Sequence, residues 1–180
     1  MGEASFGEGE APAEPQDFGV TSGSAGASPS PFPNRTRPAD GAYFARPSGT
    51  IIFATVCTKD RVRCLASDDV HRLLINVWHD AAAWLVGRYV IMPDHIHLFS
   101  SPNQESIGFD AWVKYWKSQF TRRFRGSPFR WLPRQWDTRM RCVETYEQKW
   151  DYVKRNPVRH GLTATSDEWP YQGELNILHF

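Results

Sequence analysis

The segment LVGRYVIMPDHIHLFS (85–100) most constrains the fold, because two apolar, β-branched runs stand on either side of a turn signal. Residues 85–92 predict one strand and residues 95–100 predict another. Pro93 and Asp94 separate them, since proline cannot donate to a strand ladder. Any fold for this chain must therefore accommodate two successive strands here.

The second of these strands carries an alternating pattern with two histidines. Successive side chains of a strand point to opposite faces, so His95 and His97 share one face, and Ile96 and Leu98 share the other. The apolar pair can face helices, which leaves both imidazoles on the open face of a central strand. Two such histidines form a half-site for a divalent metal. The alternative is a pair of half-exposed histidines that bind nothing.

Further hydrophobic patterns predict the remaining elements. A helix with Ser67 as its N-cap precedes the strand pair, and a helix at about 107–125 follows it. The other expected elements are a strand at 51–57, a fourth strand within 130–143, and a last helix at about 144–155 that stops before Pro157. The order β-α-β-β-α-β-α predicts an α+β fold, a ferredoxin-like split βαβ antiparallel sheet with helices on one face and an added C-terminal helix.

Residues 1–40 differ in composition from the rest of the chain. They are rich in Gly, Pro, Ala and Ser, and two arginines against six acidic residues give a net charge of −4. Such a segment buries too little apolar surface to offset chain entropy. We expect a disordered acidic tail at 1–40 and a folded domain at 41–180.

Targeting and redox features predict a cytoplasmic protein. No apolar run approaches the ~20 residues of a membrane span, and the acidic N-terminus has no apolar core of a signal peptide. The three cysteines have no CxxC spacing and cannot all pair, which fits a reducing compartment. We therefore expect no membrane partner.

Residues 111–160 form a basic block. Thirteen Lys and Arg against four acidic residues give a net charge of +9, and aromatic residues interleave with the cations. Cations meet phosphates and rings stack on bases, so the block predicts a single-stranded nucleic acid partner; the alternative is a solvated basic helix. Four-residue spacing makes Trp112, Trp116 and Phe120 the expected core stripe. The expected DNA-binding residues are Lys114, Tyr115, Lys117, Arg122, Arg123, Arg125 and Lys149.

The last helix places a tyrosine away from its apolar stripe. That stripe is formed by Tyr146, Trp150 and Val153. Tyr152 lies about 120° from it at 100° per residue, on a second stripe with Lys149 and Asn156. A phenol beside a metal site can act as a nucleophile, because the metal polarises a phosphate. Asn156 has two open interpretations: a third metal ligand, or a cap of the helix before Pro157.

Several segments now resemble a known family. RYVIMPDHIHLF is similar to the HUH segment of the IS200-like (Y1, HUH-type) transposases. WDTRMR, YEQKWDYVKRNPVRHGL and EWPYQGELNIL resemble the C-terminal signature of their REP-associated tyrosine transposase branch. The resemblance covers roughly residues 45–180, with its motifs in the family's order. The stretch FRWLPRQ departs from the sequence expected before WDTRMR, so it gives no guide to local DNA contacts.

This resemblance implies a complete set of site residues. His95 and His97 match the metal-binding histidines, Tyr152 the catalytic tyrosine, and Asn156 the polar residue that completes the metal site. It implies a transposase that uses Mg²⁺ or Mn²⁺ to cleave and rejoin single-stranded DNA at hairpin-type sites through a 5′-phosphotyrosine. Both monomers and homodimers occur among such relatives, so a homodimer stays open.

Two other classes of function remain as alternatives. One is a catalytically inactive protein that keeps the fold and binds hairpin DNA. The other is a metallohydrolase unrelated to DNA, since HxH also occurs in zinc hydrolases. The basic block and the lack of a further His, Asp or Glu ligand motif disfavour the metallohydrolase.

Overall fold

The computed structural model describes residues 49–104 and 106–180, so the expected tail at 1–40 and the start of the domain at residue 41 lie outside the described residues. Within that part no helix is long and apolar enough to cross a membrane. The cysteines all have free thiols. The described elements are β1 (Ile51–Cys57), a 3-10 turn (Lys59–Arg61), α1 (Asp68–Asp80), β2 (Trp84–Ile91), β3 (His95–Pro102), α2 (Phe109–Arg123), β4 (Trp136–Met140), α3 (Val143–Lys154), α4 (Asn156–Arg159), a 3-10 turn (Ser166–Glu168) and β5 (Gln172–Glu174).

The five strands form one antiparallel sheet in the order β4-β1-β3-β2-β5. β3, which carries the histidine pair, is the central strand, as the sequence predicted. The ferredoxin-like α+β prediction is confirmed. One cross-strand row matters below: Trp136 of β4 is opposite Thr55 of β1, which is opposite His97, which is opposite Val90 of β2.

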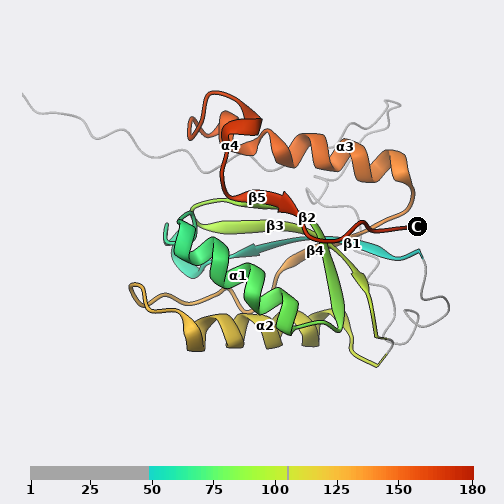
Figure 1. Ribbon diagram of the computed structural model, residues 1–180, viewed down its shortest axis with the longest axis horizontal. Helices are drawn as coiled ribbons and strands as arrows, with labels where there is room; N and C mark the ends of the chain where they lie inside the picture. Colours follow the sequence, from blue (N-terminus) through green and yellow to red (C-terminus); the bar gives the residue numbers. More distant parts are fainter. Residues whose placement is uncertain (1–48, 105) are drawn as a thin grey trace, which may run out of the picture. The chain divides into compact units, whose positions relative to one another are not determined.

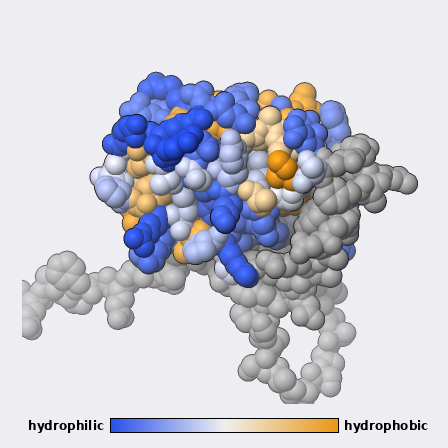
Figure 2. All heavy atoms as spheres, turned by 90° about the horizontal axis from the view of Figure 1, so that it is seen from below, coloured by the Kyte–Doolittle hydropathy of each residue, from blue (hydrophilic) through white to orange (hydrophobic). Residues whose placement is uncertain are grey.

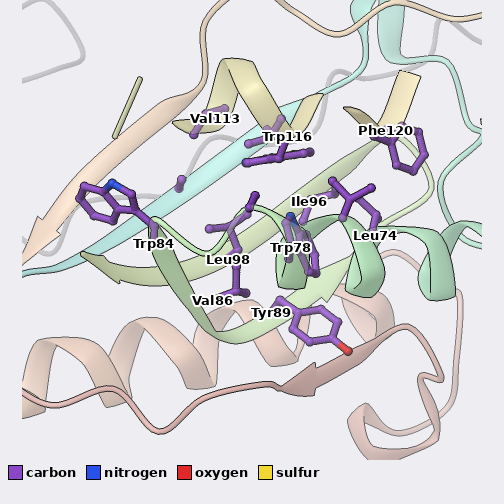
Figure 3. Close-up of a cluster of buried hydrophobic side chains, with 14 of the residues drawn as sticks. Leu74, Trp78, Trp84, Val86, Tyr89, Ile96, Leu98, Val113, Trp116 and Phe120 are labelled. Atoms are coloured by element: carbon purple, nitrogen blue, oxygen red, sulfur yellow. The ribbon is translucent and has the colours of Figure 1, made fainter. Parts of the chain in front are cut away.

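Helices cover both faces of this sheet (Figure 1). α1 and α2 lie on one side, and α3 and α4 lie on the other. The larger core lies under α1 and α2, where Ile96 and Leu98 pack against residues of both helices (Figure 3). The predicted stripe of α2 is fully buried, because Trp112, Trp116 and Phe120 are at most 1% exposed. Burial of each such ring contributes roughly 1.5–3 kcal/mol.

The C-terminal helix breaks once instead of simply ending before Pro157. α3 ends at Lys154, and Asn156 already begins the short helix α4. Proline fits in the first turn of a helix, where no backbone N–H partner is needed. Gly161 (φ +64°) then ends the turn in a left-handed conformation that glycine adopts without strain. The helix therefore stops near residue 155, as expected, and a short second helix follows it directly.

The segment after α4 contains β5, a strand that the sequence patterns did not predict. It pairs with β2 at the edge of the sheet. Side chains on both sides of β5 hold it there: the Trp169 indole donates to the carbonyl of Ile91 (3.0 Å), and the Asn176 amide donates to the carbonyl of Val86 (2.8 Å). Three residues with little apolar alternation give no strand signal of their own, so tertiary contacts make this strand.

Candidate metal and tyrosine site

His95 and His97 point to the face of the sheet opposite the larger core, as the alternation predicted. That face is not open, which corrects the prediction. His95 is 7% exposed and His97 is 8% exposed, because α3, α4 and the segment that follows them lie over this side of the sheet (Figure 1). The pair is therefore a buried polar site, and buried polar groups need partners.

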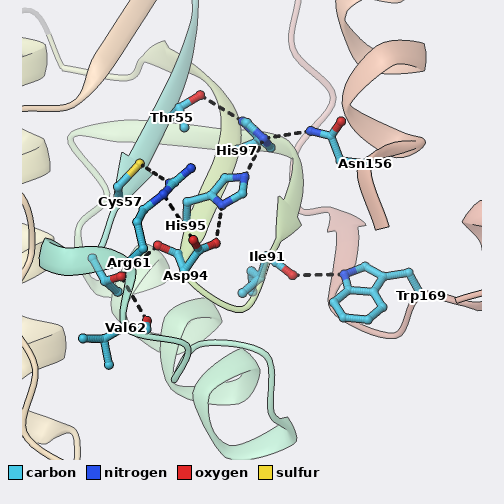
Figure 4. A network of polar contacts seen from close by, with 11 residues as sticks. Thr55, Cys57, Arg61, Val62, Ile91, Asp94, His95, His97, Asn156 and Trp169 are labelled. Carbon is cyan, nitrogen blue, oxygen red and sulfur yellow. Dashed lines mark hydrogen bonds and ion pairs between the residues drawn. The ribbon is translucent and has the colours of Figure 1, made fainter. Parts of the chain in front are cut away.

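Each histidine is held through its Nδ1 atom (Figure 4). Nδ1 of His95 donates to the carboxylate of Asp94 at 2.6 Å. Nδ1 of His97 lies 2.9 Å from the hydroxyl of Thr55, its cross-strand neighbour. Both Nε2 atoms then converge, 3.1 Å apart. With both rings protonated at Nδ1, two nitrogen lone pairs aim at one point.

Asn156 completes this convergence from the other side of the site. Its side chain is buried, and Nδ2 donates to Nε2 of His97 at 3.0 Å. The side chain therefore reaches β3 instead of capping α3, which answers the question that the sequence left open about its contacts. Rotation of the amide by 180° would exchange Nδ2 for Oδ1 and aim an oxygen at the same point.

The surroundings of His97 favour its neutral form. Burial lowers the pKa of His97 well below its usual range, and the charges of His95 and Lys149 add to the effect. His97 is thus neutral near pH 7. Two facing lone pairs repel each other unless a proton or a metal ion lies between them. No group of three or more His, Cys, Asp or Glu side chains suited to a metal occurs in the described part of the chain.

Tyr152 lies on α3, half-buried beside the smaller core of Val90, Met92, Val153 and Trp169. As predicted, Tyr146 and Val153 are buried more deeply, and Trp150 is half-buried. The guanidinium of Arg159 lies 4.6 Å from the centre of the Tyr152 ring, and Nζ of Lys149 lies 5.8 Å from it.

The structure brings three of the four predicted catalytic and metal-binding residues into direct contact: His95, His97 and Asn156. Among residues 49–104 and 106–180 no hydrogen bond joins Tyr152 to any of them. Tyr152 shares its helical segment with Asn156, four residues later. It therefore lies beside the site without being hydrogen-bonded into it.

Arg88 fastens α3 to the sheet, and the sequence patterns did not identify it. Its guanidinium pairs with Glu147 of α3 (2.7 Å) and with Glu174 of β5 (3.4 Å). It also lies over the rings of Tyr146 (5.1 Å) and Trp150 (5.5 Å). A signal existed, since Arg88 is the one charged residue within an apolar strand.

Most of the predicted DNA-binding residues lie on α2 or just after it, across the sheet from the histidine pair. Viewed from the α2 side, the surface is mostly hydrophilic (Figure 2). Lys114, Arg122 and Arg125 are exposed there, and Tyr115 is 49% exposed. Arg123 is half-buried and pairs with Asp80 (2.6 Å). Of the predicted set, only Lys149 is on the side of the site.

Lys117 was wrongly predicted to contact DNA. It is 7% exposed, and Nζ donates to the carbonyl of Leu132 at 2.7 Å. Burial lowers its pKa to about 8. The helical period explains the error, because position 117 lies one residue after Trp116 and three before Phe120, within the buried stripe.

Several basic residues, of which the sequence patterns selected only Lys149, act electrostatically on His97 and its neighbour His160. Lys149, Arg61 and His160 all act on the pKa of His97, and Arg159 acts with His95 on the pKa of His160. They come from the turn after β1, from α3, and from α4 and its C-terminal end. Only the fold collects them around one point.

Comparisons with known proteins agree with this architecture. No protein-family model matches the chain. A protein of Haemophilus influenzae that carries the provisional name REP-associated tyrosine transposase is 27% identical over 144 residues, covering 68% of this chain and 78% of the relative. The REP-associated tyrosine transposase of Escherichia coli K12 is 29% identical over 86 residues, covering 48% of this chain and 52% of that protein.

A solved structure shares the fold. It is described as a REP-associated tyrosine transposase bound to a REP hairpin. It aligns with a TM-score of 0.59 and 26% identity over 69% of this chain and 76% of the other. The two sequence relatives and this structure confirm the resemblance to the REP-associated branch.

Proposed function

We propose that this relative of the REP-associated tyrosine transposases is a metal-dependent single-stranded DNA endonuclease that cleaves and rejoins DNA at hairpin-type sites. The observation that carries the proposal is the convergence of Nε2 of His95, Nε2 of His97 and the Asn156 amide on one point. The helix that bears Tyr152 leads directly into Asn156, so nucleophile and ligand belong to one segment.

The donor set fits a divalent cation. His95 and His97 would bind through Nε2, and Asn156 through Oδ1 after the amide rotates. Imidazole nitrogens suit transition metals better than Mg²⁺, which prefers oxygen ligands, so these donors favour Mn²⁺ among the two expected ions. When bound, the metal withdraws charge from the scissile phosphate.

Tyr152 supplies the nucleophile in this proposal. Its phenolic oxygen loses its proton and bonds to phosphorus, and the bond from phosphorus to the 3′ oxygen of the preceding nucleotide breaks. The products are a 5′-phosphotyrosine and a free 3′-OH that takes up a proton. Because the phosphotyrosyl ester retains the energy of the broken bond, a 3′-OH can reverse the step without a nucleotide cofactor. The cations Lys149 and Arg159 flank the ring and offset the phosphate charge as it arrives.

In this proposal the cleaved strand lies on the α3 side of the sheet, where the histidine pair and Tyr152 are. Lys149, Arg159 and Arg61 offer charge to phosphates there. Trp136 is 50% exposed and lies in the same cross-strand row as His97, two strands away, which is about 10 Å at the usual strand spacing. It can stack on a base beside the scissile phosphate. The α2 surface is then left for the more distant duplex part of a hairpin.

One observation favours a second candidate, a hairpin-binding protein that no longer cuts. Tyr152 makes no hydrogen bond to the histidine pair in the described part of the chain. The solved relative is described as a REP-associated tyrosine transposase bound to a REP hairpin, which is compatible with either candidate. Only the endonuclease forms a covalent bond between Tyr152 and DNA, so one assay for that bond distinguishes the two candidates.

The test uses labelled single-stranded hairpins from the DNA flanking the gene, incubated with the protein and Mn²⁺. The proposal predicts a covalent protein–DNA adduct on a denaturing gel. Tyr152→Phe should abolish the adduct and keep hairpin binding, because it removes one oxygen and leaves the ring. Tyr89→Phe, which removes the same oxygen from a tyrosine buried in the larger core, is the matched control and should form the adduct normally. An adduct of unchanged yield in Tyr152→Phe would overturn the assignment of the nucleophile.

A further inference from the structure

Asp94 gives His95 a charged partner. Its Oδ1 accepts from Nδ1 of His95 at 2.6 Å. Its other oxygen, Oδ2, lies 3.2 Å from Nε of Arg61, so the carboxylate is also half of an ion pair. His97, in contrast, has the neutral hydroxyl of Thr55 as its partner.

The backbone around Asp94 is fixed by a residue from the end of β1. The carbonyl of Asp94 accepts from both the backbone N–H (2.9 Å) and the hydroxyl (3.0 Å) of Thr58, which is fully buried. Two bonds to one carbonyl prevent the turn after β2 from shifting. The carboxylate therefore has little freedom except rotation of its own side chain.

Arg61 removes that remaining freedom. Its Nε lies 3.2 Å from Oδ2 of Asp94, and its terminal nitrogen lies 3.2 Å from the sulfur of Cys57. One oxygen of Asp94 thus faces Arg61, and the other faces His95 (Figure 4).

The turn that presents Arg61 is strained. Asp60 (φ +56°) and Arg61 (φ +52°) are consecutive non-glycine residues in the left-handed region. Such residues are uncommon and persist where surrounding contacts hold them. The contacts that hold this turn include the pair with Asp94, which links the strain to the site.

We infer that Asp94, oriented by Arg61, is a positioning residue that holds His95 with Nε2 directed at the divalent cation. This inference rests on the proposed metal-dependent function. A carboxylate behind a metal-binding histidine fixes the tautomer and the ring orientation and makes the other nitrogen a stronger donor. Asp94 does not itself touch the metal or the DNA.

The first test measures binding of Mn²⁺ alone to the full chain, by the loss of the free-ion EPR signal. Asp94→Asn keeps the shape and removes the charge, so its dissociation constant for Mn²⁺ should rise roughly 10-fold or more. Asp69→Asn is the matched control, because Asp69 also pairs with an arginine (Arg72) but lies on exposed α1. The control should bind Mn²⁺ as the wild type does.

A second variant separates positioning from stability. In Arg61→Gly the left-handed conformation is free of strain, which offsets the lost ion pair, so the thermal midpoint should stay within a few degrees. The Mn²⁺ dissociation constant should nevertheless rise several-fold, because Asp94 loses its orientation. A merely structural role for Arg61 predicts the reverse: a lower midpoint and unchanged affinity.

The third readout needs no metal. Two-bond ¹H–¹⁵N correlations of the histidine rings should show His95 protonated at Nδ1 in the wild type and in a mixture of tautomers in Asp94→Ala. Wild-type Mn²⁺ affinity in Asp94→Asn, or an unchanged His95 tautomer in Asp94→Ala, would overturn the inference alone. A wild-type protein that binds no Mn²⁺ would overturn the proposed metal site and the inference together.

Discussion

Replacing Lys117 with methionine should stabilise the protein at neutral pH. Burial lowers the pKa of Lys117 from 10.5 to about 8, a gap of about 2.5 pH units that corresponds to about 3 kcal/mol against the charged form. The methionine side chain cannot donate to the carbonyl of Leu132, and loss of that hydrogen bond costs about 1 kcal/mol. The free energy of unfolding should therefore rise by about 2 kcal/mol at pH 7.

The pH dependence gives the sharper check. The folded-state pKa of Lys117 is depressed, so the unfolded state binds more protons between pH 8 and 10.5, and wild-type stability gains over the variant as pH rises through that window. The advantage of Lys117→Met should shrink from pH 8 upward. Urea unfolding of both proteins, followed by tryptophan fluorescence at pH 7, 8, 9 and 10, measures the difference in their free energies of unfolding. A difference that stays constant with pH would refute the reasoning.

The remaining predictions concern the site and the DNA surface. His97→Ala should abolish metal-dependent cleavage and leave a cooperative unfolding transition. Ile96→Asp should prevent folding, as measured by circular dichroism, because it buries a charge in the larger core. A folded Ile96→Asp variant would mean that β3 faces the other way. Arg159→Ala should weaken binding of single-stranded DNA and reduce the slope of log K against log salt concentration by about 0.7. Arg122→Ala on α2 should instead change the binding of hairpins that contain a duplex. If Arg122→Ala and not Arg159→Ala weakened single-strand binding, the cleaved strand would lie on α2. Removing residues 1–40, with their charge of −4, should tighten DNA binding at low salt and have no effect at high salt; weaker binding by the shortened chain would contradict this charge argument.

The sequence predicted those parts of the fold in which the local hydrophobic pattern matches the burial that the structure shows. β1 has the predicted bounds, and β3 presents His95 and Ile96 to opposite faces because a strand alternates strictly. The short helix α4 and the three-residue β5 were not predicted. β5 does not follow from local preference, since it depends on Trp169 and Asn176 bonding to β2.

The candidate site divides in the same way. The alternation of side chains along β3 predicted which face of the sheet His97 occupies. It did not predict that α3 and α4 would cover that face. Asn156 was selected by its spacing from Tyr152, whereas its bond to His97 crosses 59 residues of sequence. The sequence patterns did not identify Arg61. Only the strand register shows that it lies near the site, because Cys57 at the end of β1 is paired with His95, and the turn that bears Arg61 follows directly. Lys117 is different: its helical position among Trp116 and Phe120 was sufficient to predict burial.

The bond between Asn156 and His97 has a consequence for how the C-terminal third of the chain is held. A cation bound between β3 and α4 would close a long loop of chain and bind only the state in which these elements are docked. Its occupancy would therefore shift the opening equilibrium of α3 by mass action, about 2.7 kcal/mol at a concentration 100 times the dissociation constant. The supply of metal would then set how often the tyrosine-bearing helix detaches, and limited proteolysis after α3 would report the metal content of the solution.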